Sequence, residues 1–583
     1  MTTRSALLKR ALRTCGIVGS WLAILGRPGL GAERVSFQYG AFERSLSVRS
    51  IEVYVREGYV DGELAPYIQL APPDSIEALR DVLLTRADID PVAIAQFLYT
   101  PQGEALLQRL GEAIQTGSGE SGFKGLRSAT ILAAADEEGL TLLNVLRYFP
   151  TYTLHVDFNQ TIRMAQELQT LVNSSEMTVS FVRDLAAAEA EAVPLPDGVS
   201  IDLSQPGAYP WDEISTTLRD PDRDPPWGHR FPVDLYLPQT QQRAPIVVIS
   251  HGLGSDRSSF RYLAEHLASH GFAVLVPEHP GSNAKHMEAL LQGHVREIAK
   301  PEEFIDRPLD VTFLLDTLEV LAATDAQLQN RLDFDRVGVI GQSFGGYTAL
   351  TLAGAELDFA HLAQICDRDG QENRSWNASL LLQCRALDLE TENSEDPRSR
   401  FLERRFRDDR VRGVMALNPV GSALFGEMGY SNVDVPVAIL ASGADTIAPA
   451  VSEQIHPFTW LTVPERYLVL VSRGTHFSTI SASAEETVAL PSALVGPDPR
   501  IAQQYVKALS LAFFQTYIAD RLEFQPYLSA AYAQRLSRDS LPLSLVQELD
   551  GNWLDGATIE RDVEVSFELR KISKSDECDS SLN

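Results

Sequence analysis

The sequence predicts an α/β fold, with a mostly parallel central sheet and helices on both faces, preceded by a small N-terminal domain of a hairpin and several helices. From about residue 230, short apolar runs rich in β-branched residues alternate with helical patterns. Strands that are apolar along their whole length are typical of a parallel sheet covered on both faces. Between 75 and 149 the apolar residues instead follow a helical period, which indicates a separate domain.

The composition narrows the classes of function. The 583 residues include 50 Lys and Arg against 79 Asp and Glu, a formal charge of −29, and 44% of them are hydrophobic. Such a chain is globular, and its length allows two or three domains. A surface this acidic repels phosphate backbones, so we expect no nucleic-acid partner. Four cysteines are too few for a disulfide scaffold.

The N-terminus has the order of a secretory signal. Basic residues precede a short apolar stretch at 17–25, and small residues follow it: Lys9, Arg10 and Arg13, then Gly29, Gly31 and Ala32. The stretch is shorter than the roughly 20 residues that span a bilayer. We expect 1–32 to be a signal peptide and the mature protein to be exported to the periplasm or the medium. A soluble amphipathic helix is the alternative.

Residues 33–150 are expected to form a small α+β domain. Alternating apolar residues between 33 and 58 predict a β-hairpin followed by further strand, and 75–149 predict several helices. The segment contains no His and no Cys, which favours a binding, covering or folding role over chemistry.

The remaining chain is divided as follows. We expect a helical segment and linker at 151–204, an α/β domain at 205–525, and an extension at 526–583 with a disordered tail that contains Cys578. The Pro- and Asp-rich stretch 220–228 is interpreted as a linker. Strands are expected at 232–238, 246–250, 272–277, 337–340, 411–417, 437–441 and 467–471.

One motif indicates a nucleophile. Gly341-Gln342-Ser343-Phe344-Gly345 stands between the strand run RVGVI and a helical pattern. G-x-S-x-G in that context is a nucleophile elbow, a sharp turn that exposes the serine. Since a serine hydroxyl is a weak nucleophile, a base and an acid must follow, in the order Ser, Asp or Glu, His.

His476 is the predicted base. It stands five residues past the run 467–471, at the carboxyl end of what should be the last strand. His361 follows the elbow too closely and His456 precedes that strand, so both are interpreted as packing or surface histidines.

Asp445 is the predicted acid, because it follows the strand 437–441 directly and can be held rigidly. Glu427 lies ten residues beyond its strand, and Asp434 precedes its own. The alternative is that Asp445 only forms a turn, since aspartate is common in turns.

Two backbone donors are expected for the oxyanion. One is the N–H of Phe344, and the other is that of Leu253 in His251-Gly252-Leu253-Gly254, which follows the strand 246–250. No nucleotide loop or metal-ligand spacing is present in the sequence, so we expect no cofactor and no metal. His279 and His286 are assigned a cleft-lining role.

Five motifs together resemble the α/β-hydrolase family: SHGLGSDR, PEHPGSN, GQSFGG, SGADTIAP and GTHFS. Over about 205–520 the chain is most similar to plasma-type platelet-activating-factor acetylhydrolases and predicted bacterial dienelactone hydrolases. The former resemblance implies Leu253 and Phe344 as oxyanion donors, and calcium-independent removal of short or oxidised sn-2 acyl chains from phospholipids. Residues 33–150 resemble a domain of unknown function that precedes such bacterial hydrolases.

One feature departs from the plasma-type pattern. Those enzymes carry the acid after the strand that follows the elbow, where this chain has Leu417-Asn418-Pro419. Placing the acid one strand later resembles the dienelactone hydrolases.

An insertion at 355–410 is expected to form a lid or pocket wall. Cys366 and Cys384 lie 18 residues apart in it and could pair after export, or remain two buried thiols. Its charged run 398–412 suits a solvated face or an acidic headgroup.

These observations predict a secreted serine esterase that works through an acyl-enzyme on short-chain or phospholipid sn-2 esters, with transient contact to a lipid surface possible. A dienelactone or polyester hydrolase is the alternative. A catalytically silent hydrolase-fold binding module is the alternative from another class.

Overall fold

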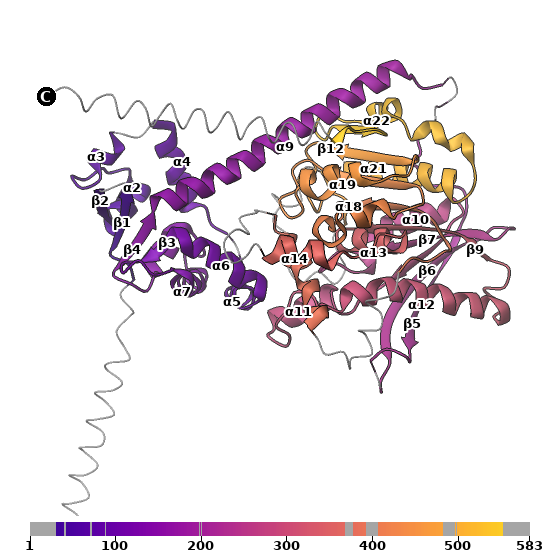
Figure 1. Ribbon diagram of the computed structural model, residues 1–583, viewed down its shortest axis with the longest axis horizontal. Coiled ribbons are helices and arrows are strands. Elements are labelled where there is room, and N and C mark those ends of the chain that lie inside the picture. The colour runs from indigo at the N-terminus through magenta and orange to yellow at the C-terminus, as the bar shows by residue number, and fades with distance from the viewer. Residues whose placement is uncertain are drawn as a thin grey trace, which may run out of the picture. The chain divides into compact units, whose positions relative to one another are not determined.

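The computed structural model describes residues 31–551 except 40–41, 70–72, 88, 197–198, 200, 225, 368–376, 392–405, 482–495 and 497 (Figure 1). Nearly all of the predicted signal peptide, residues 398–405 of the charged run, and Cys578 lie outside this range. The chain divides into two compact units: Met1–Glu167 with Leu290–Arg296, and Leu168–Ala289 with Glu297–Asn583. Within the described part, no helix is long and apolar enough to cross a membrane.

The first unit is built on a four-stranded sheet in the order β2-β1-β4-β3. β1 (Arg34–Tyr39) and β2 (Phe42–Ser47) form the expected antiparallel hairpin. β4 (Thr153–Asp157) pairs in parallel with β1 and antiparallel with β3 (Ile114–Thr116). Because β4 belongs to this sheet, the unit extends beyond residue 150.

The strand expected after the hairpin is wrong, because residues 48–57 form a helix, α2 (Val48–Glu57). Ile51, Val53 and Val55 alternate as in a strand, but Val48, Ile51 and Val55 are spaced by three and four residues, which places them on one helical face. Ser47 caps the N-terminus, and its side chain accepts a hydrogen bond from the Ser50 N–H. Gly58 ends the helix at φ 73°, a conformation that favours glycine.

Short helices complete this unit around two apolar clusters. The larger includes Leu107, Ala129, Phe149 and Leu154, and the smaller consists of Val55, Leu83 and Leu143. The helices are α3 (Ala65–Ile68), α4 (Pro73–Leu84), α5 (Pro91–Leu98), α6 (Pro101–Ala113), α7 (Phe123–Ala134) and α8 (Leu142–Tyr148). The following segment is one 35-residue helix, α9 (Phe158–Ala192), whose Val182 and Ala186 are buried in the core of the second unit.

The second unit contains a nine-stranded sheet in the order β13-β12-β11-β10-β9-β7-β8-β6-β5. The six strands from β12 to β8 in that order are parallel, and β5, β6 and β13 are antiparallel edge elements. The expected mostly parallel sheet is therefore confirmed. The strands are β5 (Trp211–Asp220), β6 (His229–Pro238), β7 (Ala244–Ser250), β8 (Ala273–Pro277), β9 (Leu332–Gln342), β10 (Val411–Leu417), β11 (Val437–Ser442), β12 (Arg466–Val471) and β13 (Leu543–Val546).

Two details of the sheet differ from expectation. The stretch 220–228 is not a linker, because Asp220 ends β5 and the residues after it connect β5 to β6, which pair over ten residues each. The buried Arg223 fixes this connection through ion pairs with Asp220, Asp306 and Asp310. β12 is not the last strand, because β13 from the C-terminal extension pairs antiparallel with it.

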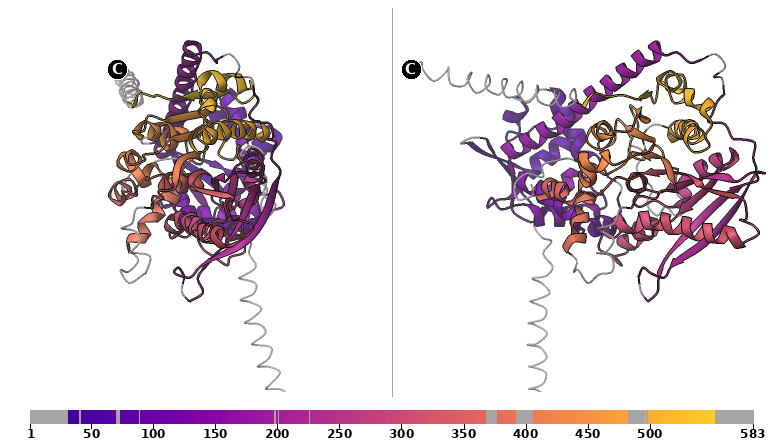
Figure 2. Two further views of the ribbon diagram at one scale, coloured as in Figure 1. Left: turned by 90° about the vertical axis from the view of Figure 1, so that its right-hand side faces the viewer. Right: turned by 45° about the vertical axis from the view of Figure 1, so that its right-hand side comes forward.

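Helices cover both faces of the sheet (Figure 1, Figure 2). Alternate residues of β7 point to opposite cores, with Ile246 and Val248 in one and Val247 and Ile249 in the other. The first core includes residues of α12 (Glu303–Thr324), α13 (Phe344–Leu352), α14 (Phe359–Asp367), α18 (Ser422–Ser431) and α19 (His456–Trp460). The second includes residues of η1 (Arg257–Phe260), α10 (Arg261–Ser269), α21 (Pro499–Tyr517), η5 (Leu522–Tyr527) and α22 (Ala530–Leu536).

The remaining helical elements are short, and four of them contribute buried residues to the first core, Leu380, Ala386, Leu389 and Ile455. These elements are α11 (Ala284–Leu291), α15 (Leu380–Gln383), η3 (Cys384–Leu387), α16 (Asp388–Thr391) and η4 (Val451–Ile455).

Candidate active site

Ser343 occupies a sharp turn between β9 and α13. Its φ of 55° and ψ of −114° are strained for a residue with a side chain. Glycines on either side are required by close packing. A Cβ at Gly341 would lie 2.0 Å from the Gly345 carbonyl oxygen, and a Cβ at Gly345 would lie 2.0 Å from that of Ser250. The turn thus has the geometry expected of a nucleophile elbow.

Ser343, His476 and Asp445 form one chain of hydrogen bonds. His476 Nε2 lies 2.9 Å from Ser343 Oγ, and His476 Nδ1 lies 2.7 Å from Asp445 Oδ2. A carboxylate can only accept, so Nδ1 carries the proton and Nε2 is left to accept from the serine hydroxyl. The three residues are each exposed by only 4–6%. The structure thus brings together all three side chains that the sequence selected.

Asp445 is fixed by the turn that follows β11. Its Oδ1 accepts the N–H groups of Ile447 at 2.9 Å and Ala448 at 2.8 Å, which leaves Oδ2 for the imidazole. The two other acidic candidates lie elsewhere. Glu427 is exposed on α18, and Asp434 pairs with Arg407.

Two amides that the sequence reasoning missed hold the loop of His476. Gln342 Nε2 donates to the His476 carbonyl oxygen at 3.0 Å, and Asn418 Nδ2 donates to the same oxygen at 3.3 Å. Asn418, at φ 44°, is fully buried at the end of β10. Its position next to the elbow strand could have drawn attention to it. After β10, where the plasma-type pattern places the acid, this chain therefore has an amide that holds the backbone of His476.

The loop after β7 and the start of α13 supply the candidate oxyanion donors. Phe344 is the first residue of α13, so its N–H has no acceptor within the helix. Leu253 follows β7 by three residues, and the next N–H, that of Gly254, donates to the Ser282 carbonyl at 2.8 Å. The loop is thus anchored immediately beside Leu253.

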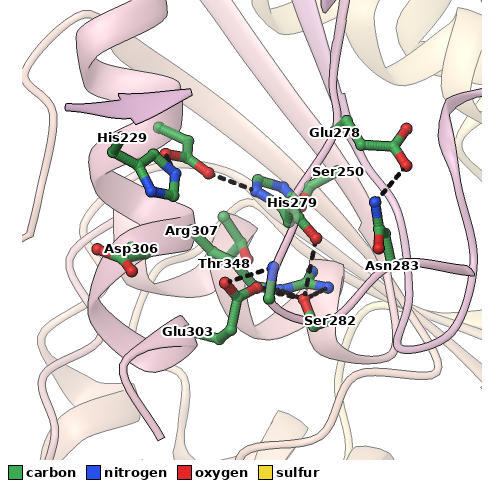
Figure 3. A network of polar contacts seen from close by, with 12 residues as sticks. His229, Ser250, Glu278, His279, Ser282, Asn283, Glu303, Asp306, Arg307 and Thr348 are labelled. Atoms are coloured by element: carbon green, nitrogen blue, oxygen red, sulfur yellow. Dashed lines mark hydrogen bonds and ion pairs between the residues drawn. The ribbon is translucent and has the colours of Figure 1, made fainter. Parts of the chain in front are cut away.

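Next to this loop lies a buried polar network, and Figure 3 shows His229, His279, Glu303 and Arg307 among its members. Asp310 of α12 joins several of these members. Asp310 Oδ1 accepts from Arg223 at 2.7 Å and lies 3.1 Å from His229 Nε2. Asp310 Oδ2 lies 3.0 Å from His279 Nδ1. Burial opposes ionisation, but the Arg223 charge and the two imidazoles hold the pKa of Asp310 well below its usual range. Burial also opposes the charge of His229, yet Asp310 raises its pKa to about 9.

The tautomers of two histidines follow from this network. Burial lowers the pKa of His279 to about 3 and that of His251 to about 4, so both are neutral. His279 donates through Nδ1 to the anionic Asp310, and its Nε2 accepts from the Ser250 hydroxyl at 3.0 Å. His251 Nε2 accepts a hydrogen bond from the backbone N–H of His279 at 3.0 Å, so His251 Nδ1 donates to the Gly252 carbonyl. His279 is fully buried and supports the loop, so its cleft-lining assignment is wrong.

Glu303 anchors the neighbouring PEHPGSN loop. It accepts the Gly281 N–H at 3.1 Å and the hydroxyl of Ser282. Burial raises the pKa of Glu303 to about 7, against the charge of Arg307. His286, on α11 just after this loop, is 7% exposed, and its Nε2 lies 2.9 Å from the Glu297 carbonyl oxygen.

The described part of the insertion is fastened at two points. Cys366 and Cys384 form a disulfide, the first of the two alternatives for these residues. The fully buried Glu453 accepts from Asn377, from Gln383 at 3.0 Å and from the N–H groups of Gly421 and Ser422. The segment around α15 is therefore tied to the N-terminus of α18.

The other two histidines after the elbow take no part in the site. His361 packs against Gly426 of α18, where a Cβ would lie 3.0 Å from its ring. The His456 ring lies 5.0 Å from that of Trp460.

Two family models match separate parts of the chain. Residues 246–490 match the model described as "Alpha/beta hydrolase family", and they contain the elbow, Asp445 and His476. Residues 31–157 match the model described as "Alpha/beta hydrolase of unknown function", and they correspond to the first unit.

Curated relatives are distant and share only part of their length. The platelet-activating factor acetylhydrolase of Canis lupus familiaris is 29% identical over 19% of this chain and 32% of its own. That of Bos taurus is also 29% identical, over the same shares. The cutinase est1 of Thermobifida alba is 26% identical over 24% of this chain and 40% of its own. The chain thus spans about a third of the acetylhydrolases' length and two fifths of the cutinase's, and its second unit has the α/β-hydrolase fold, with residues 246–490 matching that family's model.

Proposed function

We propose that the protein is a serine ester hydrolase that works through an acyl-enzyme on Ser343. The observation that carries the proposal is the continuous hydrogen-bond chain from Ser343 Oγ through His476 to Asp445 Oδ2. The α/β-hydrolase domain and the esterase relatives support the same class of reaction.

The reaction then proceeds in two halves. His476 Nε2 takes the hydroxyl proton while Ser343 Oγ attacks the ester carbonyl carbon, and the oxyanion accepts from the N–H groups of Leu253 and Phe344. His476 returns the proton to the leaving alcohol, and the acyl group stays on Ser343. In the second half, His476 takes a proton from water, the hydroxide attacks the acyl carbon, and Ser343 leaves with the proton. Asp445 stabilises the imidazolium in both halves.

We propose short-chain or phospholipid sn-2 acyl esters as substrates, reached through transient contact with a lipid surface. Relatives named platelet-activating factor acetylhydrolases support this class. A polyester is the second candidate, because other relatives are named cutinases. The position of Asp445 after β11, one strand beyond the plasma-type position, resembles the dienelactone hydrolases, which are a further alternative, and weakens the phospholipid candidate.

We further propose that the protein is exported. The N-terminal order of basic, apolar and small residues supports export. The disulfide between Cys366 and Cys384 suits an oxidising compartment. Intact mass of the secreted protein should lack about 30 N-terminal residues if the segment is a signal peptide. Retention of Met1 in exported protein would contradict this.

The function is tested with a fluorophosphonate probe and a substrate series. The probe should label the wild-type protein and not Ser343→Ala, and that variant should lose on the order of 10⁶-fold in turnover. An unlabelled but folded wild-type protein would favour a silent binding module. p-Nitrophenyl esters of increasing chain length, a short-chain phospholipid and a soluble aliphatic polyester should then rank the substrate classes.

A further inference from the structure

One buried guanidinium contacts both segments that carry the candidate oxyanion donors, the loop of Leu253 and the start of α13 at Phe344. Arg307, on the first turns of α12, is fully buried. Its Nη1 donates to the His251 carbonyl at 2.7 Å, in the loop that contains Leu253. The same guanidinium lies over the Phe344 ring, 4.2 Å from its centroid.

Arg307 is itself held from the opposite side. Its Nε and Nη2 donate to Ser282 Oγ at 3.1 and 2.7 Å, and Nε lies 3.4 Å from Glu303 Oε2 (Figure 3). Ser282 also anchors Gly254 through its carbonyl. The guanidinium plane therefore has fixed neighbours on three sides, and its position cannot change without moving one of the loops.

The helix that carries Arg307 is locked against the elbow helix. Pro308 has no N–H, so the Phe304 carbonyl is not used by the helix and accepts the Tyr347 hydroxyl of α13 at 2.7 Å. The rings of Phe304 and Phe344 meet edge to face, 4.8 Å apart. α12 and α13 thus hold Arg307 and Phe344 in a fixed relation.

Burying a guanidinium is costly, and an aliphatic side chain would fill this space more cheaply. Burial lowers the pKa of Arg307 to about 10, although Glu303 opposes the change. The site nevertheless keeps a group that can donate in one plane and stack on an aromatic face at once, which lysine cannot do.

We propose that Arg307 is a positioning residue for the oxyanion hole, which sets the distance between the Leu253 and Phe344 N–H groups. The inference rests on the proposed function, because it assigns Arg307 to the same reaction. Loss of Arg307 should weaken binding of the tetrahedral oxyanion and leave binding of the uncharged ground state nearly unchanged.

The test compares two inhibitors with the same acyl chain in the full-length protein. Ser343 Oγ adds to the carbonyl carbon of a trifluoromethyl ketone and forms an oxyanion, whereas the matching methyl ketone binds largely without addition. In Arg307→Met, we expect the inhibition constant of the trifluoromethyl ketone to rise by about 10²-fold, with kcat falling in parallel, as when an oxyanion donor is lost. The inhibition constant of the methyl ketone and KM should change by less than about threefold.

Arg223→Met is the matched control. Arg223 is a second buried arginine of the network, but it contacts Asp220, Asp306 and Asp310 and neither loop. The Arg223→Met substitution should lower thermal stability and leave the ratio of the two inhibition constants unchanged. Arg307→Lys keeps the charge beside Glu303, and its preference for the trifluoromethyl ketone over the methyl ketone should fall by about tenfold.

The outcomes separate the inference from the function. An unchanged ratio in Arg307→Met, or an equal loss in Arg223→Met, would overturn the positioning role while the esterase proposal stands. If Arg307→Met does not fold, a wild-type ratio in Arg307→Lys overturns the role in the same way. Failure of the wild-type protein to prefer the trifluoromethyl ketone would instead reject the proposed function.

Discussion

Gln342, the residue before the candidate nucleophile, donates from its side-chain amide to the backbone carbonyl of His476 at 3.0 Å. The same amide faces the oxyanion loop, since a Cβ at Gly252 would lie 2.2 Å from Gln342 Oε1. The turn that presents Ser343 therefore also sets the position of the base and limits the loop of Leu253.

Gln342→Met should lower kcat without unfolding the protein. The substitution keeps the side-chain volume but removes the donor to His476, and a displacement of about 1 Å at such a site can cost on the order of 10²-fold. We expect kcat for a p-nitrophenyl ester to fall by about 10- to 100-fold with KM little changed. Steady-state kinetics beside a circular dichroism melt measure this. An unaltered kcat would show that the His476 loop holds itself.

Asp445→Asn should reduce turnover far more than Glu427→Gln. Replacing the acid of a serine triad by Asn costs about 10⁴-fold in kcat, because the imidazole takes the wrong tautomer. We expect a loss of about 10³- to 10⁵-fold for Asp445→Asn and less than about tenfold for Glu427→Gln. The reverse order of kcat values would place the acid after β10, as in the plasma-type pattern, and favour the phospholipid substrate.

Loss of the ion pair of His229 at alkaline pH should make the protein less stable there. The pKa of His229 is raised to about 9 in the folded state, against about 6.5 in an unfolded chain. The stabilisation is therefore complete below pH 6.5 and is lost as pH rises through 9. Denaturant unfolding between pH 7 and pH 10 should show a loss on the order of 2–3 kcal/mol from this group.

His229→Gln should flatten that alkaline decline, although it lowers stability at pH 7. His361→Gln, a change at a histidine that packs against Gly426, is the control and should keep the slope. A slope that survives in His229→Gln would assign it to another group.

Reduction of the disulfide should destabilise the hydrolase domain. Cys366 and Cys384 enclose a loop of 18 residues, and closing a loop of that size contributes about 3 kcal/mol in the chain-entropy model. Cys366→Ala with Cys384→Ala should lower the melting temperature by several degrees. Alkylation followed by mass measurement provides the direct check. Modification of both thiols without a reductant would contradict the pairing.

The α/β-hydrolase fold could be predicted because two signals in the sequence are local. Apolar runs such as VAILA and YLVLV are typical of a covered parallel sheet, and GQSFGG needs its glycines for close backbone contacts. Residues 48–57 were mistaken for strand because their apolar spacing suits both periods, and the cap at Ser47 together with Gly58 decides for helix. β5 and β13 escaped notice, since edge strands carry weak patterns.

The fold class and the positions of Ser343, Asp445 and His476 at strand ends follow from the amino-acid sequence, since these depend on chain order and short-range pattern. How the three side chains meet depends on long-range contacts in the folded protein, such as that of Gln342 with His476. Long-range contacts likewise bring Arg223, His279 and Arg307 into one buried network next to the oxyanion loop. Such partners come from segments far apart in the chain, and no local pattern specifies which buried charges face one another.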